Sequence, residues 1–141
     1  FEDGSAAERF GRMVTALGGP ADFVERFDAY LPDAPVVVDV PAPASGLVQA
    51  VDGRGLGNAV VELGGGRRRA ADEIDPRVGL SHCAGIGALV DGDFPLARIH
   101  AATRDDADRA AARVLAAYTV GDAAPEDADA VLSRLGPEDA G

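Results

Sequence analysis

The chain has 141 residues, 47% hydrophobic but only 5% aromatic, which suits one modest domain with a core of Val, Leu, Ile and Ala. The net charge of −11 argues against nucleic acid and anionic membranes as partners, because both require a basic face. No apolar run approaches the ~20 residues of a membrane span, and the acidic start Phe1-Glu2-Asp3 lacks the layout of a signal peptide.

All 13 basic residues are arginine. The absence of lysine excludes a Schiff-base lysine, a phosphate-loop lysine and a lipoyl or biotinyl attachment site in this chain. Cys83 is the only cysteine, so no internal disulfide can form, and we expect a reducing cytoplasmic location.

The first 34 residues predict two helices. Residues 5–17 form an amphipathic pattern with Ser5 and Glu8 spaced as a capping box, and with an apolar face made of Phe10, Met13, Val14 and Leu17. A second helix is predicted over residues 21–31 and ends at Pro32. We expect the apolar face of the first helix to pack against the following α/β unit or a second copy of the chain.

Short strands and helices follow. β-Branched and apolar runs predict strands at residues 36–40 and 47–51 and further short strands within residues 78–101, with turns at Gly85, Gly87 and 91–93. Helical spacing predicts helices over residues 54–63, 104–119 and 125–135, with Thr103 and Asp106 capping the second and Asp105 pairing with Arg109 on its open side. The fold class is therefore α+β: two lead-in helices, then a small, mixed, strongly bent β-sheet of barrel-sandwich or hammerhead type with packed helices.

Two glycine-rich segments are candidate anion sites. Residues 53–57 open a helix after a strand and could offer backbone N–H groups to a phosphate, but they do not form G-x-G-x-x-G, and close helix–strand packing is the favoured interpretation of these glycines. The sharper candidate is a run of three glycines and three arginines, made of Gly64, Gly65, Gly66, Arg67, Arg68 and Arg69. The glycines predict a hinge and the arginines suit phosphate or carboxylate, whereas the alternative is a solvated loop whose arginines pair with Asp72, Glu73 and Asp75.

Other reactive side chains predict no active site. His82 and His100 fall in predicted strands without a third ligand at metal-like spacing, so we expect structural roles. Cys83 would point away from His82 in a strand, and we interpret it as a small core residue. Acidic clusters at residues 105–108 and 126–129 sit at helix starts, where they favour the helix dipole, and do not form a calcium loop.

Several segments in the right order together resemble one family. The run S-A-A-E-R-F-G-R-M-V-T-A-L-G-G at residues 5–19, the helix ending in G-G-G-R at residues 52–67, and the shorter segments 44–48, 74–79 and 90–101 are similar to the C-terminal region of pyrimidine-nucleoside phosphorylases, including thymidine phosphorylases. The resemblance implies a pentosyltransferase that cleaves the N-glycosidic bond of thymidine-like nucleosides with phosphate, without a metal or organic cofactor. It also implies a cleft that closes between two domains, and a homodimer.

The resemblance places the family's phosphate loop, base-binding residues and catalytic histidine before the matched segment. No position from Phe1 to Gly141 therefore receives a catalytic, cofactor-binding or metal-binding role, and we expect this chain to be inactive without the catalytic portion of the enzyme. The one role carried over is that of the loop 64–79, which in the family faces the cleft. The expected organisation is a helical lead-in over residues 1–34, a C-terminal α/β domain over 35–121, and a short helix with a frayed tail over 122–141.

Two alternatives remain at this point. The segment 90–99 resembles the closing hairpin of lipoyl and biotinyl domains, so the chain could be a non-enzymatic interaction module with that fold but no attachment lysine. It could also be a stand-alone interaction module with no enzymatic parent.

Overall fold

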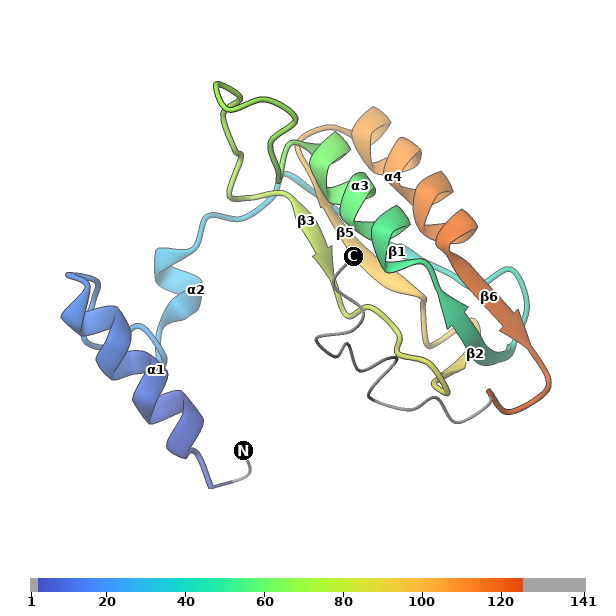
Figure 1. Ribbon diagram of the computed structural model, residues 1–141, viewed down its shortest axis with the longest axis horizontal. Coiled ribbons are helices and arrows are strands. Elements are labelled where there is room, and N and C mark those ends of the chain that lie inside the picture. The colour runs from blue at the N-terminus through green and yellow to red at the C-terminus, as the bar shows by residue number, and fades with distance from the viewer. Residues whose placement is uncertain (1–2, 126–141) are drawn as a thin grey trace, which may run out of the picture.

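The computed structural model describes residues 3–125 and has the predicted α+β class (Figure 1). Two helices precede two three-stranded sheets, and two further helices lie side by side over the strands. Every strand pairing is antiparallel, so the strands form two separate antiparallel sheets rather than the one mixed sheet predicted. The predicted helix 125–135 lies outside the described residues except for Pro125.

The first sheet has the strand order β1 (Val36–Val40), β5 (Ala97–Ala101), β3 (Gly79–Ser81). Its central strand β5 alternates buried and half-buried residues, so Ala97, Ile99 and Ala101 face the core while Arg98 and His100 face outward. Strict alternation is the pattern of a sheet with one covered face. This register places Arg98 directly opposite Asp39 of β1.

The second sheet has the order β4 (Leu89–Val90), β2 (Gly46–Val51), β6 (Tyr118–Gly121). Strand β6 corrects the sequence prediction, which continued the preceding helix to residue 119. The helix ends at Ala117, and Tyr118 is already extended because it pairs with Val51 of β2. Strands β4 and β5 belong to different sheets, so the segment 90–99 is not the hairpin that a lipoyl or biotinyl domain requires.

The core lies between the sheets and α4 (Arg104–Ala117). Its largest fully buried side chains come from both sheets, from the segment before β5 and from α4: Leu96, Ile99, Val40, Val48, Val90 and Val114. The Thr103 hydroxyl caps α4 by accepting from the Asp106 N–H at 3.2 Å, as predicted. Helix α3 (Gly53–Leu63) packs alongside α4, buries Ala59 and Leu63, and points its C-terminal end toward the loop of residues 64–79, which we call the glycine-arginine loop.

The lead-in helices form a separate small cluster. Helix α1 (Ser5–Ala16) starts after a left-handed Gly4, and Ser5 bonds to Asp3 rather than to Glu8, so the predicted capping box is wrong. The predicted helix 21–31 is also too long, since residues 21–26 form turns and only α2 (Phe27–Tyr30) is helical.

The apolar face of α1 does not pack on the α/β unit. Phe10 contacts Phe23 edge-on, with ring centroids 6.0 Å apart, and Phe23 stacks on Tyr30. Leu17 nevertheless stays 87% exposed, and Phe10 and Met13 are more than half exposed. Packing against the α/β unit is therefore a wrong prediction for these side chains, while packing against a second copy stays a prediction.

Candidate functional site

The glycine-arginine loop begins where α3 ends. Gly64 has a left-handed backbone, with φ 97°, and its N–H and that of Gly65 bond back to the carbonyls of Val61 and Val60. Residues with a side chain avoid this backbone region, so a glycine ends the helix here. At Gly65 and Gly66 an added Cβ would lie 2.9 Å from Val60 and 2.7 Å from Val61. Each of the three glycines thus has a local structural reason, which does not depend on hinge motion.

Two aspartates fix the backbone of the loop. One carboxylate oxygen of Asp72 accepts the N–H groups of Arg68 and Arg69 at 3.0 and 2.9 Å. Asp75 accepts the backbone N–H, Nε and Nη2 of Arg77 at 3.0, 2.9 and 2.8 Å. The hydrogen bond from the Arg77 side chain, with that from its backbone, lowers the pKa of Asp75 to about 2. These aspartates bind backbone groups and Arg77, and not the guanidinium groups of residues 67–69 as the alternative reading predicted.

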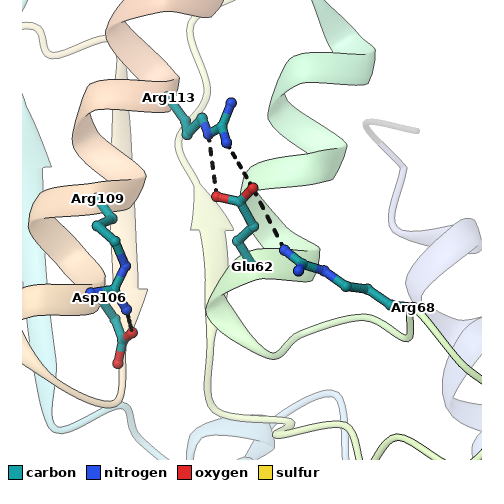
Figure 2. Close-up of polar contacts among 5 residues, drawn as sticks. All are labelled: Glu62, Arg68, Asp106, Arg109 and Arg113. Atoms are coloured by element: carbon teal, nitrogen blue, oxygen red, sulfur yellow. Dashed lines mark hydrogen bonds and ion pairs between the residues drawn. The ribbon is translucent and has the colours of Figure 1, made fainter.

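The Arg68 side chain is tied to the two long helices through Glu62 (Figure 2). Glu62 accepts Nε and Nη2 of Arg113 from α4 at 3.2 and 2.9 Å, and its Oε1 lies 3.6 Å from Nη2 of Arg68. A carboxylate has enough lone pairs to serve both arginines. Glu62 therefore links the loop to α3 and α4. Sequence reasoning missed this residue, although its place one position before the last residue of α3 was a usable signal.

Figure 2 also corrects a smaller prediction on α4. Arg109 pairs with Asp106, three residues earlier, rather than with Asp105. Asp106 already accepts the Thr103 hydroxyl, so the cap and the ion pair share one carboxylate at the start of α4. Such exposed pairs contribute little to stability, and their main effect here is to order the first turn of the helix.

Arg67 and Arg69 differ from Arg68. Both are exposed, and within residues 3–125 no ion pair joins either guanidinium to a carboxylate. Asp72 holds the backbone N–H groups of Arg69 and of the intervening Arg68, while the side chains of Arg67 and Arg69 are available to an external anion. Arginine can present paired N–H donors to a phosphate or carboxylate.

The other glycine-rich segment, residues 53–57, shows no comparable arrangement. Asp52 caps α3 by accepting the Gly55 N–H at 3.0 Å, so a side chain of this protein already occupies that end of the helix. An added Cβ at Gly55 would lie 2.8 Å from the Asp52 carboxylate and 3.5 Å from Ala117. Close packing accounts for Gly55, whereas Gly53 and Gly57 face open space.

The two histidines lie close together through Ser81 at the end of β3. The Ser81 hydroxyl lies 3.0 Å from His82 Nδ1 and 2.8 Å from His100 Nε2. His100 is in β5 as predicted, but His82 follows β3 with a left-handed backbone at φ 52° and is not in a strand. One hydroxyl proton can serve only one imidazole, so the other must donate to Ser81.

Cys83 is exposed, which corrects its interpretation as a core residue. The positive φ of His82 turns the chain away from the strand at this point, so the alternation that would have buried Cys83 does not continue. Burial, together with the neighbouring Cys83, raises the pKa of Tyr118 to about 12. The Tyr118 hydroxyl donates to the Ala84 carbonyl at 3.1 Å.

Within residues 3–125, no three His, Cys, Asp or Glu side chains are grouped so as to hold a metal ion. Over the same residues, none of the helices combines the length and the apolar character needed to cross a membrane.

Comparison with known proteins decides the family. Residues 47–121, more than half of the chain, match the family model of the pyrimidine nucleoside phosphorylase C-terminal domain. The chain belongs to this family. It is also 48% identical over 135 residues to a thymidine phosphorylase of Sinorhizobium medicae (strain WSM419). The aligned region covers 96% of this chain and 31% of that relative. The chain thus spans about a third of the length of this curated relative.

The region of this chain that matches the family model contains α3, the glycine-arginine loop, and both sheets apart from β1 and the first residue of β2. It also contains the segment 90–99, on which the lipoyl-like alternative rested, so that alternative loses its basis. The expected boundary between a helical lead-in and an α/β domain near residue 35 remains a prediction.

Proposed function

We propose that this chain serves as the C-terminal domain of a thymidine phosphorylase, in which residues 64–79 help to close the substrate cleft. The overall reaction would convert thymidine and phosphate to thymine and 2-deoxyribose 1-phosphate. The glycosidic C–N bond breaks, a C–O bond to phosphate forms, and the base takes up a proton. Phosphate is then a co-substrate, and no organic cofactor is needed.

The proposed role of the loop rests on a difference in ion pairing among its three consecutive arginines. Arg68 pairs with Glu62, which also holds Arg113, and Asp72 accepts the backbone N–H groups of Arg68 and Arg69. Arg67 and Arg69 make no ion pair within the described residues and lie on a firmly anchored loop. A fixed backbone reduces the entropy lost when an anion orders these side chains, and their guanidinium groups are not already neutralised by a carboxylate of the described chain, so this arrangement supports a contribution to holding an anionic substrate.

The chemistry itself would come from the catalytic portion of the enzyme. No residue of the described chain is assigned a catalytic role, because the carboxylates of Glu62, Asp72 and Asp75 at the loop are already engaged with arginines and backbone N–H groups of this chain. We expect the enzyme to be a cytoplasmic homodimer, with the catalytic portion as the direct partner of this domain. The purified 141-residue chain should leave thymidine and phosphate unchanged.

The test uses a complete thymidine phosphorylase that carries this sequence as its C-terminal domain. Replacing Arg67 and Arg69 together by Ala should raise KM for phosphate or lower kcat by about tenfold, because a hydrogen bond to a charged group contributes about 1.5–3 kcal/mol. Arg54→Ala is the matched control, since Arg54 is also exposed and makes no ion pair within the described residues. Unchanged kinetics in the double variant, or an equal loss in the control, would remove the proposed role of the loop.

A further inference from the structure

A cavity lies at the opposite end of β3 from the glycine-arginine loop. Its volume is about 350 Å³, within the range of small-molecule sites. Most of its wall is apolar, contributed by the segment that connects β3 with β5: Ala84, Ala88, Leu89, Val90, Phe94 and Pro95. The proposed function leaves this cavity without a role.

An ion pair supplies two of the four polar side chains of the cavity wall, the other two being His82 and Asp93. Asp39 and Arg98 face each other across β1 and β5, with Nε to Oδ1 at 2.7 Å and Nη2 to Oδ2 at 3.0 Å, and both line the cavity. The pair is not sequestered, because 47% of the Asp39 side chain and 42% of the Arg98 side chain are exposed. Nη1 of Arg98 has no partner among the described residues, and each carboxylate oxygen keeps a lone pair.

The protonation states of the pair are fixed near neutral pH. The Arg98 hydrogen bond lowers the pKa of Asp39, and the same hydrogen bond to Asp39 raises the pKa of Arg98. Asp39 therefore only accepts hydrogen bonds and Arg98 only donates them. A ligand that satisfies both needs one donor and one acceptor side by side.

The charge and shape of the cavity wall further restrict the chemical class of ligand that can bind. The Asp39–Arg98 pair is neutral overall, Asp93 adds a negative charge, and His82 adds a ring that can donate or accept a hydrogen bond. An anion is therefore disfavoured, while a cation would have to approach the guanidinium. Phe94 is 62% exposed and lines the cavity, so its ring offers an apolar surface to a second flat ring.

We propose that this cavity binds a neutral, planar cyclic amide, with the ring against Phe94 and the adjacent N–H and C=O groups on Asp39 and Arg98. The ligand N–H donates to the Asp39 carboxylate, and the ligand carbonyl accepts from the Arg98 guanidinium. The inference does not rest on the proposed function, because it concerns binding to this chain without turnover.

The test titrates 2-pyridone, a small ring with a single N–H beside a single C=O, into the 141-residue chain and follows backbone amide shifts by NMR. Saturable shifts centred on Arg98 and Phe94 are expected. N-methyl-2-pyridone, which has the same ring and carbonyl but no N–H, should bind at least about tenfold more weakly, since about 1.4 kcal/mol corresponds to tenfold.

Two variants complete the test. Phe94→Ala should weaken 2-pyridone binding by about five- to tenfold. Ile86→Ala is the matched control, because Ile86 is 60% exposed in the same connecting segment and does not line the cavity, and it should bind as the natural chain does. Both side chains are mostly exposed, so we expect alanine at either position to leave the fold intact, and the amide spectrum verifies this. The proposal is overturned by unsaturable shifts, by equal binding of the N-methyl ligand, or by equal effects of the two variants.

Discussion

Helix α3 offers two alanine substitutions with opposite expected effects on stability. Gly64 and Gly57 both face open space, so an added Cβ at either position meets no atom within 4 Å. They differ in backbone conformation, since Gly64 ends the helix at φ 97° whereas Gly57 lies inside the helix. Alanine at these two positions therefore tests backbone conformation alone, without a steric term.

The expected magnitudes follow from this difference. Alanine at residue 64 adds left-handed strain of about 1–2 kcal/mol, partly offset by about 0.4–1 kcal/mol from the reduced entropy of the unfolded chain. The net result is a destabilisation of about 1 kcal/mol. Alanine at residue 57 should instead stabilise the chain by about 0.5–1 kcal/mol, because glycine is the poorer residue in a helix.

Urea unfolding followed by circular dichroism measures both free energies, and thermal unfolding should separate the two variants by roughly 10 °C for a domain of this size. The wild-type chain should lie between them. A neutral or stabilising Gly64→Ala would show that Gly64 does not need its left-handed backbone. A destabilising Gly57→Ala would show that the helix interior at this point is not as the structure describes it.

Three further outcomes are expected. Thr103→Ala should lower the free energy of unfolding by about 1 kcal/mol through loss of the α4 cap, and Thr103→Ser should retain most of it. Asp75, whose pKa is lowered to about 2, contributes stability that is present above its unfolded pKa near 3.8 and is lost as the pH falls through about 2. Asp75→Asn should therefore reduce the slope of stability against pH between about 4 and 2 in acid titrations, and an unchanged slope would contradict the Arg77 contacts. Cys83 should react with a thiol reagent in the native chain at a rate within several-fold of its rate in the urea-unfolded chain. A much slower reaction in the native chain would show that Cys83 is buried after all.

Local sequence signals determined most of the regular elements. The apolar spacing of α1, α3 and α4, and the β-branched run of β1, predicted these elements within a few residues. Thr103 predicted the start of α4 because its hydroxyl acts within one turn of the chain. The α+β class follows from the order of these elements, and the family could be identified from the same segments.

Tertiary structure decided the features that depend on residues far apart in the chain. Tyr118 begins a strand only because β2 offers it a pairing partner, and β4 and β5 separate into two sheets although they are neighbours in sequence. Glu62 holds Arg68 and Arg113, and Ser81 contacts both its neighbour His82 and His100, which lies 19 residues further along the chain. The cavity beside Asp39 and Arg98 likewise exists only once β1 and β5 pair. Helical periodicity and caps act over a few residues and can be read locally, whereas a strand partner, an ion pair or a cavity depends on which distant segments the core brings together.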